Sequence, residues 1–448
     1  MSIAVEALFT SALGLQAPWV VSKVELDIAK RRIDFDVTCE ATKLSCPACD
    51  EPGQGVHDRI RREWRHLDFF QYEAWLHADV PRVDCDSCGK TTQVEVPWAR
   101  PGSGFTLLFE ALAMTLCQTL PVAQAAQQLR VKSKRLWRRI EHYVGVARAK
   151  DTMGGVKVIG IDETSIRSGQ NYVTVVHDLE AKRLLFLTEG SDHKTVAAFK
   201  TDLIAHGGDP DEIEHVCMDM GAAYIKGVTE VLPEAEISFD RFHVIAMANK
   251  AMDEVRSAEM RDQPRVVRAV VGTERKVIRG MMWGMRKNPS NWNKKEMNTM
   301  YHVQRSNLKS ARAWRLKEGL RSAYAAGVQS NCADTAQEAL RSWISWARRC
   351  RLEPFKKLAA TLRDRLPGVV RGMLDGRSNA YVEAMNGMLQ QTKRAARGFR
   401  TVKNFAAIAY LRMSRLKHLP QNPLRSATPR NQGATRYRAG MQVPHKTA

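Results

Sequence analysis

The chain has 448 residues, two to four times the length of a common domain of about 100–200 residues, so we expect several domains. Its 69 Lys and Arg against 48 Asp and Glu give a net charge of +21, which favours a polyanionic partner. The composition, 44% hydrophobic and 26% charged, excludes a disordered, collagen-like or disulfide-dense chain. No apolar stretch approaches the roughly 18 residues of a membrane span. The first residues lack the basic start of a secretory signal, so we expect a cytoplasmic protein without a membrane partner.

Two C-x2-C pairs stand in the first hundred residues, Cys46 with Cys49 and Cys85 with Cys88. Two such turns offer four thiolates to one ion, which is the ligand set of a closed, structural Zn2+ site. The pattern predicts a zinc ribbon in a domain at 1–100, whose core we expect to be too small to fold without the metal. The alternative is a redox dithiol or two unrelated pairs.

A basic helical domain is expected at 101–150, after the loop rich in Pro and Gly at 99–104. In its third helix the spacing of Leu136, Ile140 and Val144 directs these side chains inward. Four cations are left on the opposite side of this helix: Lys134, Arg135, Arg138 and Arg139. The pattern predicts a helix-turn-helix unit that binds double-stranded DNA through these cations. The usual turn glycine is missing, with Arg130 near its place, so a generic basic three-helix unit remains the alternative.

The rest of the chain predicts a mixed α/β sheet interrupted by helices. Residues 151–243 show the order β-β-β-α-β-α-β, and residues 244–374 are helical and strongly basic, which we interpret as an insertion. The last part of the sheet domain follows at 375–418, and the basic tail at 419–448 is expected to be disordered.

Acidic residues at strand ends are the candidate site. Asp162 ends the first apolar strand and Asp219 ends the fourth, so both carboxylates can meet at one edge of the sheet. With Glu383 from a later helix they would form an oxygen cage for two Mg2+ ions about 3.5–4 Å apart, which suits phosphoryl transfer. Taken singly, each of these residues could equally be a turn, cap or solvated residue.

The order of several short motifs resembles the ISL3 family of bacterial insertion-sequence transposases over essentially the whole chain. Beside the zinc knuckles, the motifs are Gly160-Ile161-Asp162-Glu163, Cys217-Met218-Asp219-Met220, Phe239-Asp240-Arg241-Phe242-His243 and Glu383-Ala384-Met385-Asn386-Gly387. The resemblance implies a multidomain α/β chain with an RNase H-like DDE core, in which Asp162, Asp219 and Glu383 are catalytic and hold Mg2+ or Mn2+.

The resemblance also implies a function. The chain would bind the terminal inverted repeats of its own insertion sequence, cleave the DNA there and transfer the strand to target DNA, acting near the nucleoid as a homodimer or a larger assembly. Three residues are possible accessories, Asp240, His243 and Asn386, although capping and packing explain the first two equally well. The alternatives are a non-catalytic zinc and helix-turn-helix regulator derived from a transposase, and a nuclease that cuts but does not join.

Overall fold

The computed structural model describes residues 4–166, 172–375 and 378–423. The chain divides into two compact units, Met1–Tyr143 together with the described residues from His418, and Val144–Lys417. Most of the predicted disordered tail, from residue 424 on, lies outside the described residues. None of the described helices is both long and apolar enough to cross a membrane.

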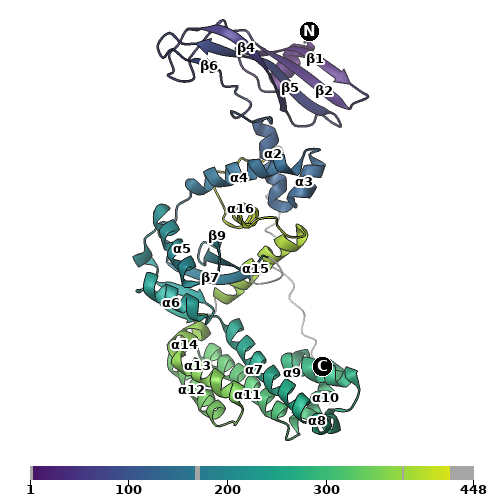
Figure 1. The fold of residues 1–448 in the computed structure, drawn as a ribbon, viewed down its shortest axis with the longest axis vertical. Coiled ribbons are helices and arrows are strands. Elements are labelled where there is room, and N and C mark those ends of the chain that lie inside the picture. Colours follow the sequence, from purple (N-terminus) through teal and green to yellow (C-terminus); the bar gives the residue numbers. More distant parts are fainter. Residues whose placement is uncertain (1–3, 167–171, 376–377, 424–448) are drawn as a thin grey trace, which may run out of the picture. The chain divides into compact units, whose positions relative to one another are not determined.

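The first unit contains a long antiparallel and parallel sheet that carries the zinc knuckles at one end (Figure 1). Its strands follow the order β1-β2-β5-β4-β3. Strand β6 pairs with the last residues of β5, beyond the part of β5 that pairs with β2. Their bounds are β1 (Trp19–Asp27), β2 (Arg32–Cys39), β3 (Lys43–Leu44), β4 (Gln54–Arg65), β5 (Glu73–Asp84) and β6 (Thr91–Gln93). The short helix α1 (Val5–Ala12) packs against β1.

The sheet has a hydrophobic core of its own, which the sequence analysis did not expect. Alternate residues of β2 and β5 are buried, as period-two patterning requires of a sheet with one covered face. The rings of Trp19 and Trp64 each meet that of Trp98 edge to face, with centroids 4.9 and 5.5 Å apart. This core is separate from the small apolar cluster around Cys46 and Cys85, so it is larger than the sequence predicts, and the dependence of folding on zinc stays a prediction.

Three helices follow in the first unit, α2 (Leu107–Thr119), α3 (Val122–Gln128) and α4 (Ser133–Ala149), and α4 runs on into the second. The predicted inward face of α4 is confirmed for Leu136, Ile140 and Val144, which are all buried. Arg130, near the place of the missing turn glycine, has a φ of +56°. This left-handed conformation is the one that glycine adopts most easily, so an arginine serves the turn here at some cost in strain.

The second unit is built on a five-stranded mixed sheet of the order β11-β10-β7-β8-β9. Strands β7, β10 and β11 are parallel, whereas β8 and β9 are antiparallel to their neighbours. Their bounds are β7 (Val158–Ser165), β8 (Tyr172–Asp178), β9 (Arg183–Glu189), β10 (His215–Met218) and β11 (Glu236–Phe239), with α5 (His193–Ala205), the 3-10 turn η1 (Pro210–Glu212) and α6 (Ala222–Val231) between them. The predicted order of elements is confirmed, and it is the arrangement of an RNase H-like core.

A helical segment follows β11, as predicted (Figure 1). It comprises α7 (Arg241–Asp262), α8 (Pro264–Val271), α9 (Arg275–Arg286), η2 (Pro289–Asn291), α10 (Lys294–Gln304), α11 (Lys309–Ser330), α12 (Ala333–Arg348), α13 (Glu353–Asp364) and α14 (Leu366–Leu374). Helix α14 returns to the sheet and packs on β11. A Cβ at Gly372 would lie 2.0 Å from the carbonyl oxygen of Phe239, so only glycine permits this approach.

Two last helices complete the second unit, α15 (Ser378–Ala395) and α16 (Val402–Met413). Helix α15 lies against β7, and α16 lies against β9, where the backbone N–H of Leu187 donates to the Tyr410 hydroxyl over 2.9 Å. The last part of the chain thus returns to the sheet after the helical segment, as the sequence predicts.

Candidate functional site

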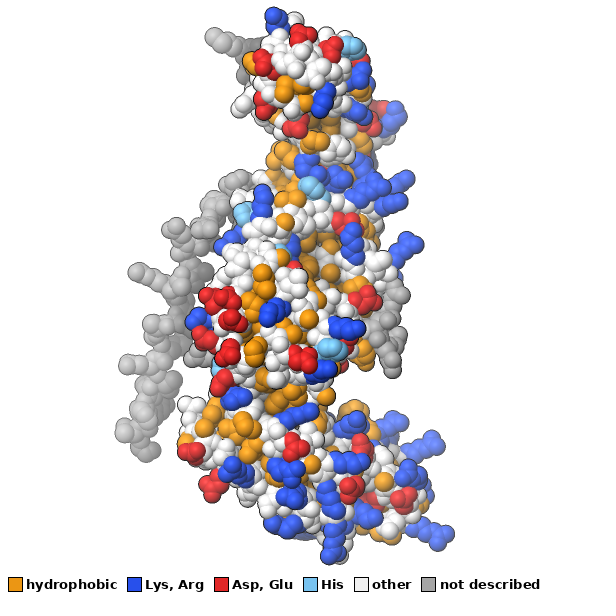
Figure 2. All heavy atoms as spheres, turned by 60° about the vertical axis from the view of Figure 1, so that its left-hand side comes forward, with side chains coloured by type: hydrophobic (Ala, Val, Ile, Leu, Met, Phe, Trp, Pro, Cys, Tyr) orange, Lys and Arg blue, Asp and Glu red, His pale blue; other side chains and the backbone are white. Residues whose placement is uncertain are grey.

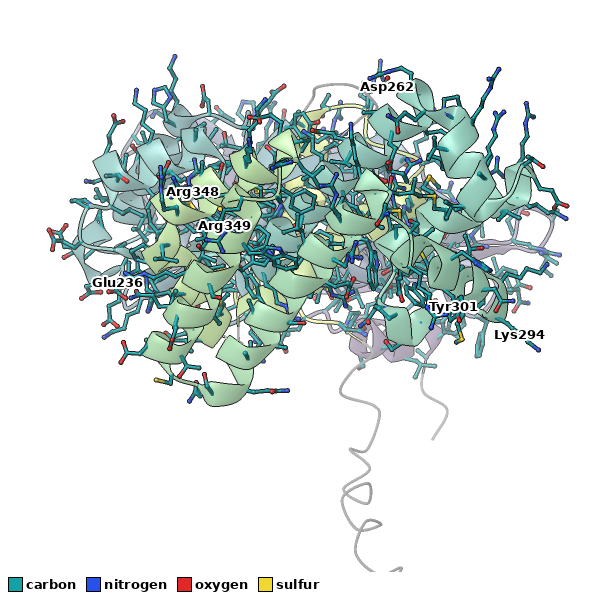
Figure 3. All side chains as sticks on the ribbon, turned by 90° about the horizontal axis from the view of Figure 1, so that it is seen from below. Glu236, Asp262, Lys294, Tyr301, Arg348 and Arg349 are labelled. Atoms are coloured by element: carbon teal, nitrogen blue, oxygen red, sulfur yellow. The ribbon has the colours of Figure 1, made fainter. Side chains whose placement is uncertain are left out.

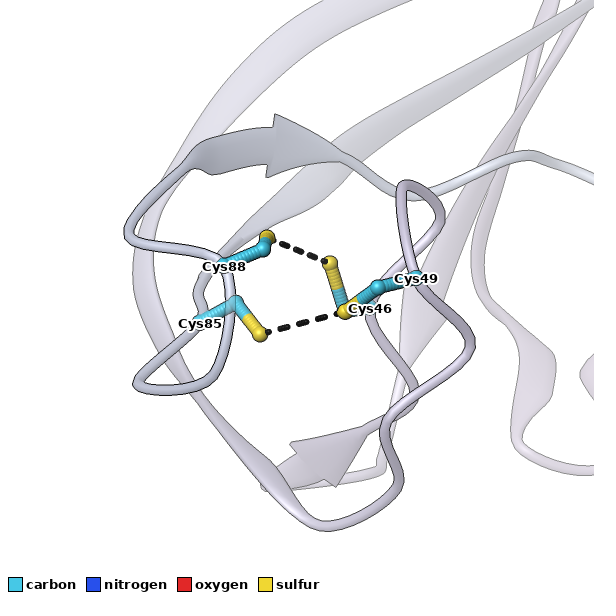
Figure 4. Close-up of side chains that lie close together, drawn as sticks. All are labelled: Cys46, Cys49, Cys85 and Cys88. Carbon is cyan, nitrogen blue, oxygen red and sulfur yellow. Dashed lines mark hydrogen bonds between the residues drawn. The ribbon is translucent and has the colours of Figure 1, made fainter.

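The four knuckle cysteines converge at the end of the first sheet (Figure 4). Their sulfur atoms all lie within 4.8 Å of one another, with Cys46 Sγ 3.8 Å from Cys88 Sγ and Cys49 Sγ 3.5 Å from Cys85 Sγ. The backbone N–H of Ala48 donates to the Cys46 sulfur and lowers the pKa of this thiol to about 7, which favours the thiolate that a metal binds. Four sulfur donors without a fifth polar partner suit tetrahedral Zn2+, so the group is a structural zinc site.

The cations of α4 divide into two kinds. Lys134 and Arg138 are exposed, as expected of residues that contact DNA. Arg135 instead stacks on the Phe105 ring at 3.9 Å and donates to the carbonyl oxygen of Gly104. Arg139 donates to the buried carboxylate of Glu110 over 3.0 Å. The structure therefore gives two of the four predicted DNA-binding cations partners inside the domain.

Glu110 is the centre of a buried polar network on α2. Its oxygens accept hydrogen bonds from Arg100, Ser103, Arg139 and Tyr143. Burial alone would raise the pKa of this carboxyl, but the hydrogen bonds together outweigh burial, and its pKa lies below the ordinary value. The carboxylate thus ties α2, α4 and the preceding loop together.

Three carboxylates line up at the carboxyl ends of the three parallel strands. Met218 of β10 lies opposite Ile161 of β7 and opposite Phe239 of β11, so the residues that come next are Asp162, Asp219 and Asp240, one on each strand in the order of the sheet. Asp219 and Asp240 directly follow their strands. The prediction that Asp162 ends its strand is wrong, because β7 continues to Ser165 by pairing with β8 alone. The carboxylates that the sequence predicts to meet are brought to one edge.

Asp162 is a largely buried carboxyl with polar and charged neighbours. Burial raises its pKa, with a smaller contribution from the nearby charge of Asp219, while the N–H of Glu163 and the side chains of His243 and Asn386 act in the other direction. The Asn386 amide of α15 donates to Asp162, and its own oxygen is buried without a hydrogen-bond partner among the described residues. Oxygen donors of this kind are the ligands that Mg2+ prefers.

Asp240 has two contacts, and they agree with both interpretations left open by the sequence. One oxygen accepts the backbone N–H of Phe242 over 2.8 Å and so caps α7. The other lies 3.8 Å from the His243 Nε2. Burial raises the pKa of Asp240, and the imidazole of His243 offsets part of that effect.

Polar side chains of α15, spaced about one turn apart, donate hydrogen bonds to β7. Beside the Asn386 contact, Gln390 donates to the Thr164 hydroxyl and Lys393 donates to the carbonyl oxygen of Ser165. Sequence reasoning missed Gln390 and Lys393, although their spacing from Asn386 of four and seven residues could have indicated one face of a helix. The side chain of Glu383, also on α15, lies outside the described residues.

Three ranges of the chain match models of transposase domains. Residues 159–409 match a family model described as "Transposase", residues 94–144 match the helix-turn-helix domain of transposase family ISL3, and residues 43–88 match the zinc finger of the transposases of IS204, IS1001, IS1096 and IS1165. The transposase for insertion sequence element IS1557 of Mycobacterium tuberculosis is 30% identical over 82% of this chain and 84% of its own length. The transposase for IS1001 of Bordetella parapertussis is 23% identical over 82% of this chain and 87% of its own length.

An RNase H-like core preceded by a zinc ribbon and a helix-turn-helix domain defines a DNA transposase. The chain belongs to the ISL3 family of insertion-sequence transposases. It is therefore a DNA-binding, DNA-cleaving enzyme, and its four knuckle cysteines form the zinc ribbon of that family.

Proposed function

We propose that the chain excises and inserts its own element by the DDE mechanism, with Asp162, Asp219 and Glu383 as catalytic residues and metal ligands. The observation that carries the proposal is the register of the parallel strands, which aligns Asp162 with Asp219 at the edge where α15 is attached. An attacking water would break one phosphodiester bond at each element end, and the freed 3′-hydroxyl would then attack the target strand. The leaving group of each step is the 3′-oxygen of the strand that is broken.

The donor set at this edge fits hard divalent cations. Two carboxylates at the ends of adjacent strands offer oxygen ligands, as does the Asn386 side-chain oxygen, which has no hydrogen-bond partner among the described residues. Mg2+ or Mn2+, when bound there, would supply charge for the developing oxyanions and lower the pKa of the attacking oxygen. The chain's own residues hold that charge in place and keep the reacting phosphate at the sheet edge.

Helical periodicity supports Glu383 as the third ligand. It precedes Asn386 by three residues and Gln390 by seven, so all three positions share one face of α15. Asn386 and Gln390 contact β7 at Asp162 and Thr164, and the Glu383 position is one turn further along the same face. Asn386 would then orient Asp162, and His243 would balance negative charge beside Asp240.

Binding of the element ends is assigned to the first unit. Lys134 and Arg138 are the exposed cations of α4 and would contact the terminal inverted repeats, whereas Arg135 and Arg139 would support the helix from inside. Since two ends must be brought together before the strand is transferred, we also propose that the active form is a dimer or a larger assembly.

The test uses purified full-length protein, a duplex with its element end, and Mg2+. Asp162→Asn, Asp219→Asn and Glu383→Gln should each bind the duplex normally yet lose nearly all cleavage, because each removes charge from one cage and such residues act as a unit. Asp211→Asn, at an exposed carboxylate on η1, is the matched control and should cleave normally. Cleavage that persists after chelation of all divalent metal would contradict the mechanism.

The same assay separates the alternatives from other classes of protein. A regulator derived from a transposase would bind the ends without cutting them in either Mg2+ or Mn2+. A simple nuclease would cut the ends but leave no joined product when target DNA is added. Joined products that depend on all three carboxylates are the result that the proposed function requires.

A further inference from the structure

A hollow lined by arginines lies on the helical segment of the second unit. Helix α12 and the residue after it present Arg341, Arg348 and Arg349, and Arg363 of α13 faces the same space. The hollow has a volume of about 630 Å3 and is open to solvent, with Ile344, Ser345 and Leu366 completing its lining. Figure 3 labels Arg348 and Arg349, which lie close together on this segment. None of the described residues that line the hollow carries a carboxylate, although Arg341 also borders a neighbouring hollow with Asp334 and Glu338.

The positive charge of the hollow is largely uncompensated. Within the part of the chain that the structure describes, Arg341 and Arg348 have no ion-pair partner, and Arg349 donates only to the Ser345 hydroxyl. Arg363 pairs with its neighbour Asp364, which is exposed. On the face shown in Figure 2, Lys and Arg side chains are frequent over the helical segment. Like charges that lie close together repel one another, and a bound anion would relieve this repulsion. The arrangement therefore favours an anionic ligand over a structural role for these arginines.

The dimensions of the hollow favour a polymer over a single anion. Arg341 and Arg348 are seven residues apart on one face of α12, about 10 Å along the helix axis. Successive phosphates of one DNA strand advance by about 3.4 Å along the duplex, so this distance covers several phosphates. A free phosphate would engage only one or two of the arginines.

The hollow is joined to the catalytic edge through the start of α14. Arg365, beside the lining residue Leu366, donates to the carbonyl oxygen of Met220, the residue after Asp219. Further along α14, Arg371 donates to the carbonyl oxygen of Ile237 in β11 over 2.9 Å. The end of the hollow at Leu366 is therefore fixed to the sheet edge that carries Asp162 and Asp219.

We propose that this arginine hollow binds the phosphate backbone of the duplex whose scissile phosphate lies at Asp162 and Asp219 during cleavage. The inference rests on the proposed function and names a surface that holds the cleavable DNA beside the catalytic edge. Its contacts are to phosphates, so it adds affinity without reading sequence.

The first test is the salt dependence of DNA binding. Arg341, Arg348 and Arg349 are replaced together by Gln in the full chain, and the affinity for an uncut duplex with its element end is measured at several salt concentrations. Three lost phosphate contacts should reduce the slope of log K against log[salt] by about 2–3, at about 0.9 per contact. The control replaces Arg275, Lys276 and Arg279 of α9 by Gln, which removes the same charge from another exposed part of the segment. An unchanged slope, or an equal reduction in both variants, overturns the inference.

The second test distinguishes the cleavable DNA from target DNA. The arginine variant should raise the KM for cleavage of the uncut duplex and change kcat little. A loss confined to strand transfer would assign the hollow to target DNA and overturn the inference. Cleavage by Asp162→Asn would contradict the proposed function. Normal DNA binding by the arginine variant, together with an inactive Asp162→Asn, would contradict this inference alone.

Discussion

Two neighbouring arginines of α4 should respond to substitution in opposite ways. Arg138 is exposed, whereas Arg139 donates to the buried carboxylate of Glu110. We predict that Arg138→Ala weakens binding of the element ends and leaves the domain as stable as before. Arg139→Ala should instead destabilise the three helices, and any loss of DNA binding should follow from that instability.

The size of the effect follows from the contacts of Glu110. Without Arg139 the carboxylate keeps Arg100, at 2.8 and 3.0 Å, together with Ser103 and Tyr143, so it is not left as an unpaired buried charge. The loss is therefore close to that of one hydrogen bond to a charged group, about 2 kcal/mol, rather than the larger penalty of a fully broken buried pair. A change of about 2 kcal/mol corresponds to an approximately 30-fold change in an opening equilibrium.

Amide hydrogen exchange of the full-length protein measures the opening equilibrium of α2, the helix that carries Glu110. The protected amides of α2 should exchange about 30-fold faster in Arg139→Ala and at the original rate in Arg138→Ala. The affinity for an element-end duplex is measured for both variants at the same temperature. Unchanged protection of α2 in Arg139→Ala, together with reduced affinity for DNA, would refute the reasoning and return Arg139 to the DNA-contacting face.

Three further predictions concern other parts of the chain. Chelation of zinc should increase proteolysis at the knuckles around Cys46 while the sheet strands remain protected, because the tryptophan core is separate from the metal site; loss of protection throughout the sheet would contradict this. Acid should destabilise the helix-turn-helix domain, because the folded-state pKa of Glu110 lies below its ordinary value. The stabilisation by Glu110 is full above about pH 4.5 and is lost as the pH falls through the folded-state pKa. Glu110→Gln should abolish this dependence in unfolding measurements from about pH 3 to 6. Gln390→Ala should raise the Mg2+ concentration needed for half-maximal cleavage without changing DNA affinity, and an unaltered metal requirement would exclude a positioning role.

The order of helices and strands along the second unit and the candidate edge were predictable from the sequence because they depend on local patterns. Apolar runs bounded by turn residues define the five strands of the second unit, and acidic residues next to two of these runs define the candidate edge. The alignment of Asp240 with Asp219 was not predictable, since the register of β10 against β11 is set by packing between distant residues. Helical periodicity likewise places charged residues on one face of a helix, but it does not predict which of them pairs with a buried residue of opposite charge.

Arg139 is the example of that limit. A helical wheel separates apolar from charged positions, but it cannot tell that Glu110, in the first turn of an apolar helix, is buried and pairs with cations from other elements. The sequence signal was the acidic residue itself, because a carboxylate among buried side chains is rarely left unpaired. The size of the core in the first unit was missed for a related reason. Strands β1 and β2 precede the knuckles, and no short motif indicates that β2 pairs with β5.

The row of three carboxylates also limits which of them can share an ion. Neighbouring strands lie about 4.8 Å apart, so Asp162 and Asp240, two strands apart, are separated by about 10 Å at the backbone. Their oxygens come within the roughly 4.2 Å that one Mg2+ spans only if both side chains extend toward each other across Asp219. Among the described residues, only the knuckle cysteines form a group of three or more ligand atoms within 4.8 Å. Asp219 is adjacent to both neighbours, but α15 is attached at Asp162. We therefore expect a third ligand from α15 to complete the site on the side away from Asp240, with Asp240 capping α7 beside His243.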